Sequence, residues 1–137
     1  MNMKIEGPAH ISLGRTGEDV VVRYLVRRGF KIIERNFRRK YGEIDIVAKA
    51  PDRTLVFIEV KTMAAGGEII PEDQYSASKR QKTERICQAY AGGNPKLIDE
   101  KTGWRMDLIA IQIPRELSES ELTEIEKNCE IKYYENV

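Results

Sequence analysis

Gly42-Glu43-Ile44-Asp45-Ile46 and, further along the chain, Glu59-Val60-Lys61 are the two stretches that decide the fold of this protein. Both alternate apolar with charged residues, which is typical of β-strands with one face against a core. Between them lie Pro51, Asp52 and Arg53, three residues that favour a turn. The two stretches are therefore predicted to form the arms of a β-hairpin.

The position of the turn predicts which residues face each other. With the turn centred on Asp52, three cross-strand pairs share one face of the sheet: Asp45 with Glu59, Glu43 with Lys61, and Val47 with Phe57. Two carboxylates directly opposite each other destabilise a strand pair. Asp45 and Glu59 therefore require a compensating positive charge.

A divalent cation is the expected partner of Asp45 and Glu59. Mg²⁺ prefers oxygen ligands, is often held by one or two carboxylates, and keeps waters and substrate phosphates in its remaining positions. Such a cation would polarise a phosphate and activate a water, while Lys61 would orient that water or neutralise the phosphorane. The reaction class indicated is phosphodiester hydrolysis, with Mn²⁺ as the alternative cation.

The alternative interpretation is an amphipathic hairpin whose charged face is simply solvated. Residues 44–47 and 55–58 argue against it, because they are too apolar for a fully solvated hairpin. The apolar composition of these two segments favours a cleft, rather than an open surface, as the location of Asp45 and Glu59.

Composition indicates one soluble globular domain over residues 1–137. The chain is 41% hydrophobic and 33% charged, which suits a protein with a real core. No apolar run approaches the roughly 20 residues of a membrane span. Residues 1–10 lack the apolar core of a signal peptide, so we expect a cytoplasmic location. Cys87, Cys129 and His10 are too few for structural zinc, and a disulfide is not expected in a reducing compartment.

The rest of the chain predicts helices and strands around the hairpin. An apolar stripe at spacings of three and four residues predicts a helix over 13–28, preceded by a flexible segment over 1–10. Further strands are expected over 30–37, 104–113 and 131–134, and further helices over 78–91 and 117–128. A basic turn is expected over 38–41 and a mobile loop over 62–71. This order predicts an α/β fold with a mixed sheet.

Charge is unevenly distributed, although the net charge is only +1. Eight basic residues and one acid lie between Arg23 and Lys40, and a second basic group comprises Lys79, Arg80, Lys82 and Arg85. Residues 115–137 form an acidic C-terminal segment. This polarity favours a face that binds a polyanion, with ordinary solvated surface as the alternative.

Motifs over nearly the whole chain resemble one family of bacterial proteins. They are, in order, Gly14, Gly17, Glu18, Tyr24, Leu25 and Gly29; Arg35, Asn36 and Arg38; Gly42, Glu43, Ile44 and Asp45; Phe57, Ile58, Glu59, Val60 and Lys61; Lys79; Asp107; and Asn136. They resemble the YraN family, which looks like a member of the restriction-endonuclease-like superfamily and is similar to archaeal Holliday junction resolvases. Among the departures, Lys82, Thr83 and Tyr133 replace the family's Arg, Leu and His; none affects the Asp and Glu-x-Lys positions.

This resemblance implies a restriction-endonuclease-like mixed β-sheet flanked by α-helices, and magnesium-dependent nuclease action on DNA. Asp45, Glu59 and Lys61 correspond to the resolvases' Asp and Glu-x-Lys positions, and Glu18 to their helical glutamate. The similar resolvases are twofold dimers, and symmetric cutting of a four-way junction needs two sites. A homodimer is therefore expected, through the strand over 108–113 or through Tyr133 and Tyr134.

Three functions compete at this stage. The first is a metal-dependent DNA endonuclease, selective for branched DNA, with Glu18 or Glu43 completing the metal shell and four basic residues holding nucleic acid: Arg35, Arg38, Lys79 and Lys82. The second is a non-catalytic nucleic-acid-binding module on the same fold. The third is an accessory protein that binds a partner through its acidic segment. The acids favour the first, because a docking surface would gain by losing carboxylates that repel phosphate.

Overall fold

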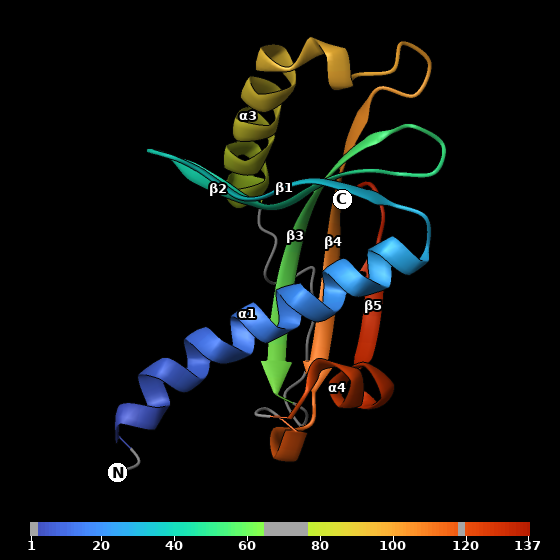
Figure 1. Ribbon diagram of the computed structural model, residues 1–137. Coiled ribbons are helices and arrows are strands. Elements are labelled where there is room, and N and C mark those ends of the chain that lie inside the picture. The colour runs from blue at the N-terminus through green and yellow to red at the C-terminus, as the bar shows by residue number, and fades with distance from the viewer. Residues whose placement is uncertain (1–2, 65–76, 118–119) are drawn as a thin grey trace.

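Five strands form one mixed sheet in the computed structural model, which describes residues 3–64, 77–117 and 120–137 (Figure 1). Their spatial order follows the chain: β1 Lys31–Arg39, β2 Gly42–Lys49, β3 Leu55–Ala64, β4 Trp104–Ile113 and β5 Glu130–Tyr134. Only the β3–β4 pair is parallel; the other three pairs are antiparallel. The predicted α/β fold with a mixed sheet is confirmed, and it is consistent with a restriction-endonuclease-like architecture.

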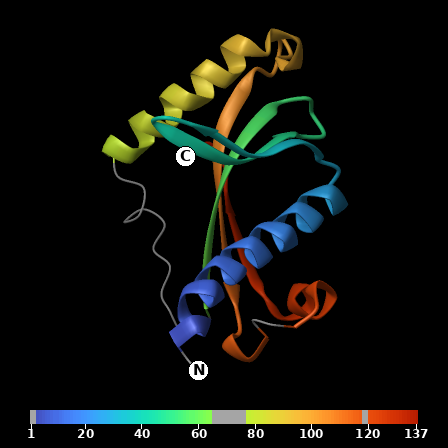
Figure 2. The ribbon, with the colours of Figure 1, turned by 60° about the vertical axis from the view of Figure 1, so that its left-hand side comes forward.

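Helices α1 (Met3–Arg27) and α3 (Ala77–Gly93) cover opposite faces of this sheet (Figure 2). Alternate residues of β3 point to the two faces, because side chains alternate along a strand. Val56 and Ile58 pack in the core on the α1 side, and Leu55 and Phe57 in the core on the α3 side. Helix α4 (Leu122–Asn128) joins the α1 side, where its Ile125 is fully buried.

Several predicted boundaries change. Helix α1 begins at Met3, so residues 3–10 of the expected flexible segment are helical; residues 1–2 lie outside the described part. The predicted basic turn shrinks, because Arg38 and Arg39 belong to β1. Residues 62–64 of the expected loop extend β3, and residues 65–71 lie outside the described part. The expected helix over 117–128 is replaced by a 3₁₀ turn at Arg115–Leu117 followed by α4.

The predicted hairpin register is confirmed where β2 and β3 pair, since Val47 lies opposite Phe57. The pairing ends at Ile46 and Ile58, so the predicted cross-strand pair of Asp45 with Glu59 is not formed. The predicted pairing of Glu43 with Lys61 is wrong: Glu43 lies opposite Arg38 of β1, and Lys61 opposite Ala110 of β4. Two-stranded ribbons twist strongly, which carries the β1–β2 hairpin away from β3.

Strict alternation fails in β2 at Asp45. Ile44 and Val47 both pack on the α3 side, whereas Ile46 packs on the α1 side. The opposing residue on β1 is Asn36, which has a φ of 55°, in the left-handed region. The prediction that Glu43 and Val47 share a face is therefore wrong, because the strand changes face at Asp45.

The two predicted dimer patches belong to the fold itself. Strand β4 is paired on both edges, and five of its six residues over 108–113 are buried. Tyr133 packs against Phe30, with ring centroids 6.4 Å apart. A homodimer stays a prediction, but the strand over 108–113 cannot supply its interface.

Asp107 fastens the C-terminal segment to the sheet. Its carboxylate is fully buried and accepts hydrogen bonds from Arg105, from the Tyr133 hydroxyl and from the Asn136 backbone N–H. Buried carboxylates are retained when they are paired and hydrogen-bonded. Asp107 is thus a structural residue. Within the described ranges, no helix is long and apolar enough to cross a membrane.

Candidate active site

A cleft of about 500 Å³ opens where the β2–β3 pairing ends, and it is lined by residues of α1, β2, β3 and α3. Each of these elements contributes charged side chains to its lining: Glu18 from α1, Glu43 and Asp45 from β2, Glu59 and Lys61 from β3, and Lys79 and Lys82 from α3. The structure thus brings the predicted catalytic trio together with both predicted supporting carboxylates.

Asp45 is a largely buried carboxylate that lines this cleft. Its Oδ2 accepts a hydrogen bond from the backbone N–H of Val60 at 2.8 Å, which holds it beside Glu59. Burial raises the pKa of Asp45 from 3.8 to about 6; the Val60 hydrogen bond opposes this rise, and the charges of Glu18, Glu59 and Glu43 add to it. A positive charge beside Asp45 would therefore stabilise its ionised form.

Glu59 is held by two ammonium groups. Lys61 Nζ lies 3.0 Å and Lys79 Nζ 2.9 Å from the same oxygen, Oε2. Lys61 is two residues along β3, whereas Lys79 comes from the first turn of α3. Lys79, which was predicted to bind nucleic acid, thus contacts Glu59, a predicted metal ligand.

Glu18 is held at the edge of the cleft by Arg35. Arg35 Nη2 lies 2.8 Å from Asp19 Oδ1 and 3.6 Å from Glu18 Oε1. Burial raises the pKa of Glu18, and the Arg35 charge partly offsets that rise. Arg35, predicted to hold nucleic acid, is occupied with two acids of α1 and so orients Glu18.

A close approach of α1 to β3 places Glu18 there. A Cβ on Gly17 would collide with the side chain of Thr62, so only glycine allows this contact. Sequence reasoning missed this contact, although Gly17 stood in the apolar stripe of the helix. It also missed the Val60 N–H, which no side-chain pattern reveals, and Tyr41, which lines the cleft.

The rim of the cleft is basic. Arg38 Nε lies 3.1 Å from Glu43 Oε2, and both side chains are more than half exposed. Lys82 is exposed one turn after Lys79 on α3. The predicted basic run from Arg23 to Lys40 does not form one face, because Arg23 and Arg27 of α1 both pair with Glu126 of α4, at 2.6 and 3.0 Å. The cations beside the cleft come from the end of the β1–β2 hairpin and from α3.

Asp45 and Glu59 suit a small divalent cation. They are two oxygen donors from adjacent strands, one of them largely buried among other carboxylates, and Mg²⁺ is usually held by one or two carboxylates. In the part of the chain that the structure describes, no group of three or more His, Cys, Asp or Glu side chains is arranged to hold a metal. The proposed metal site therefore has two protein ligands, Asp45 and Glu59, and Glu59 also contacts the ammonium groups of Lys61 and Lys79.

Comparison with known proteins assigns the chain to a family. The model of the uncharacterised protein family UPF0102 matches residues 17–111. The chain belongs to the UPF0102 family. This is the YraN family that the motifs indicate, and the matched region contains Glu18, Asp45, Glu59, Lys61 and Lys79.

Individual UPF0102 proteins align over much of their length. A relative from Alkaliphilus oremlandii is 33% identical over 124 residues, which cover 90% of this chain and 95% of the relative. One from Thermodesulfovibrio yellowstonii is 37% identical over 75% of this chain and 88% of its own. One from Syntrophotalea carbinolica is 44% identical over 58% of this chain and 64% of its own. These names give the family and no activity.

Proposed function

We propose that this protein is a metal-dependent DNA endonuclease that hydrolyses phosphodiester bonds in the cleft between α1 and α3. The observation that carries the proposal is the environment of Asp45, a largely buried carboxylate with a raised pKa and three other carboxylates acting on it. Burying such a charge destabilises a fold unless something compensates for it. Strongly perturbed carboxylates in a cleft are typical of catalytic and metal sites.

Mg²⁺, or alternatively Mn²⁺, would be held by Asp45 and Glu59. Glu18 or Glu43, which line the same cleft, would complete the shell by moving toward the cation. When bound, the cation supplies polarisation of the scissile phosphate and a lowered pKa for the attacking water. Arg35 acts as a positioning residue, since its guanidinium orients Glu18.

Lys61 has two tasks in this proposal. One of its N–H donors holds Glu59 Oε2 at 3.0 Å, and an ammonium group carries three donors in all. In this proposal, another of these donors binds a water or a phosphate oxygen. A fixed positive charge at that position stabilises the negative charge that develops as the phosphodiester is attacked.

Lys79, Lys82 and Arg38 would hold the DNA backbone around the cleft. Lys79 lies 2.9 Å from Glu59, so an incoming phosphate would compete with that carboxylate for its ammonium group. Lys82 lines the cleft, Arg38 is paired with the cleft residue Glu43, and both cationic side chains are exposed. DNA is the expected polyanion because the YraN motifs resemble those of nucleases that act on it.

A specific observation also favours a second function, a non-catalytic nucleic-acid-binding module. Two lysines neutralise Glu59 within the chain, so this acid repels phosphate less than an unpaired one would. In such a module, the cleft would bind DNA with no reaction.

A nicking assay separates the two functions. Linear, flapped and four-way DNA are incubated with Mg²⁺ or Mn²⁺ and wild-type protein, Asp45→Asn, or the control Glu130→Gln, which removes an exposed carboxylate of β5. We expect cleavage by wild type and Glu130→Gln and none by Asp45→Asn. Cleavage retained in Asp45→Asn would refute the site. Metal binding without nicking of any DNA would favour the binding module.

A further inference from the structure

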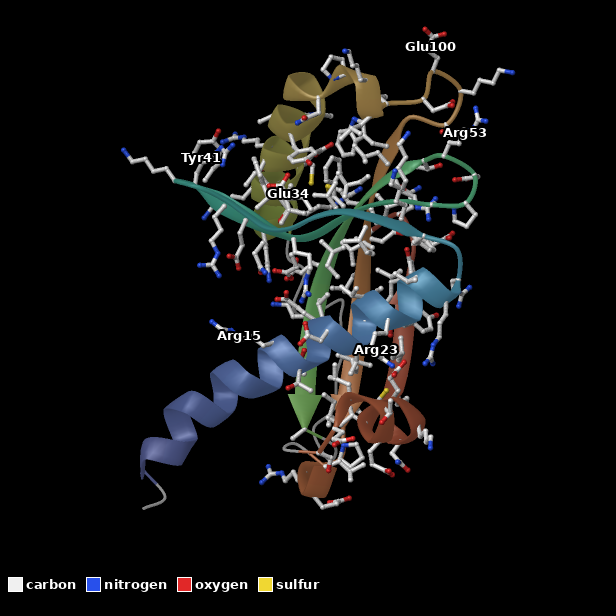
Figure 3. All side chains as sticks on the ribbon, in the orientation of Figure 1. Arg15, Arg23, Glu34, Tyr41, Arg53 and Glu100 are labelled. Carbon is white, nitrogen blue, oxygen red and sulfur yellow. The ribbon has the colours of Figure 1, made fainter. Side chains whose placement is uncertain are left out.

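The turn of the β1–β2 hairpin presents an aromatic side chain to solvent. Tyr41 is 62% exposed, and only one other large hydrophobic side chain among the described residues is comparably exposed, Val26 at 54%. Figure 3 places Tyr41 on the end of the hairpin, beside α3. Tyr41 also lines the same cleft as Asp45 and Glu59.

The Tyr41 ring is exposed, and another aromatic residue of the hairpin makes its packing contact with α3. The hairpin is anchored by Phe37, whose ring packs edge-on against Tyr90 of α3 with centroids 4.8 Å apart. Gly42 lies beside Ile86 of α3, whose Cδ1 would be 3.7 Å from a Cβ built on this glycine. Phe37 makes this packing contact and the Tyr41 ring is exposed, so packing of the hairpin does not account for an aromatic side chain at position 41.

Basic residues directly precede Tyr41 at the end of the hairpin. Arg38, Arg39 and Lys40 precede it in the sequence. The Arg39 guanidinium lies over the Phe37 ring, 4.0 Å from its centroid, and donates to the Arg38 carbonyl at 2.7 Å. Stacking on an aromatic face limits the conformations of an arginine. The turn therefore combines an exposed ring with at least one oriented cation.

We propose that Tyr41 stacks on an unpaired base, so that the hairpin directs the cleft to DNA with single-stranded nucleotides beside the scissile phosphate. This inference rests on the proposed function and names its substrate class. Single strands are bound by aromatic side chains on which bases stack, next to basic side chains that follow the backbone. In a continuous duplex both faces of each internal base are already stacked, so a ring on a hairpin finds a free face inside the molecule only at gaps and flaps.

The test measures binding without metal, so that it is independent of cleavage. Three labelled DNAs of equal length are titrated in chelator and followed by fluorescence anisotropy: a paired duplex, the same duplex with a single-stranded flap, and a single strand. We expect Tyr41→Ala to lose roughly tenfold in affinity for the flap and the single strand and nothing for the duplex. Tyr41→Phe, which keeps the ring, should bind like wild type.

Two further readouts sharpen the result. Lys40→Ala should weaken binding to all three DNAs alike, because a phosphate contact does not distinguish paired from unpaired bases. A 2-aminopurine base in the flap should be quenched by wild type and by Tyr41→Phe, and less by Tyr41→Ala.

The outcomes distinguish this inference from the nuclease proposal. Equal affinities of Tyr41→Ala and wild type, or an equal loss on all three DNAs, would overturn base stacking even if the metal-dependent nicking assay succeeds. The expected selective loss would support base stacking even if no DNA is cut, and only the endonuclease proposal would then fail. Because Tyr41 is exposed, melting temperatures matching wild type are expected and verify that the variants are folded.

Discussion

Replacing Asp45 by asparagine should stabilise the metal-free protein at pH 8 and leave its stability nearly unchanged at pH 4. In the folded protein the pKa of Asp45 is about 6, against an ordinary value of 3.8. The folded state therefore binds this proton more tightly than the unfolded state does. Its stabilising contribution is complete below about pH 4 and is lost as the pH rises through 6.

The magnitude follows from the difference between these two pKa values. Each unit corresponds to about 1.4 kcal/mol, so the shift to about 6 costs the ionised side chain about 3 kcal/mol at pH 8. Asparagine carries no charge, and its Oδ1 still accepts a hydrogen bond from the Val60 N–H. For a chain of this length, a gain of this size raises the melting temperature by about 10 °C.

Thermal and urea unfolding of wild type and Asp45→Asn between pH 4 and 8, in chelator, measure this effect. The difference in unfolding free energy between the two proteins isolates Asp45, since other titrating groups contribute to both. Glu130→Gln, an exposed carboxylate variant, should show no comparable pH-dependent difference. A difference between Asp45→Asn and wild type that stays constant from pH 4 to 8, or a less stable variant at pH 8, would refute the reasoning.

Magnesium supplies the complementary measurement at pH 8. A ligand that binds only the folded state stabilises it, by about 2.7 kcal/mol at one hundred times its dissociation constant. Wild type should gain stability as Mg²⁺ is added, and Asp45→Asn should gain little. Identical responses would contradict a metal held by Asp45.

Three other predictions test the helices and the assembly. Gly17→Ala should destabilise the protein by about 1–3 kcal/mol in urea unfolding, because the new methyl group collides with Thr62. Gly14→Ala has open space around the new methyl group and should be neutral or stabilising. Equal effects of the two substitutions would contradict the close contact between α1 and β3. Lys79→Ala and Lys82→Ala should each weaken DNA binding and reduce the slope of log affinity against log salt by about 0.9 for each phosphate that the variant no longer neutralises. Lys101→Ala, which removes an exposed charge in the turn before β4 that does not line the cleft, should leave the slope unchanged. Unchanged slopes for Lys79→Ala and Lys82→Ala would mark these lysines as ordinary surface charges. Light scattering at micromolar concentration, with and without four-way DNA, should detect a homodimer; a monomer in both conditions would leave an enzyme that nicks single strands one at a time.

Local patterns in the sequence determined the strands and the register of the central hairpin. The alternation of apolar and charged residues and the turn at Asp52 placed Val47 opposite Phe57, as observed. The strand at Trp104–Ile113 was predicted with its observed bounds, and the helix at Ala77–Gly93 was predicted to within two residues at each end. These features follow from sequence because side-chain period and turn chemistry act between near neighbours. The same patterns predicted three of the charged residues that line the cleft: Asp45, Glu59 and Lys61.

Only the tertiary structure decided how those residues are held. Asp45 lies where β2 changes face, opposite an asparagine with positive φ, and no alternation pattern predicts such a break. Lys79 reaches Glu59 because α3 packs on that face of the sheet, and Glu18 reaches the cleft because Gly17 lets α1 approach Thr62. Glu126 likewise pairs with Arg23 and Arg27, so these two arginines do not join the other basic residues of the run from Arg23 to Lys40 on one face; Glu126 lies 103 residues from Arg23 in the sequence. Such contacts depend on the burial and packing of distant segments, and burial also sets the pKa of Asp45, so they exist only once the chain has folded.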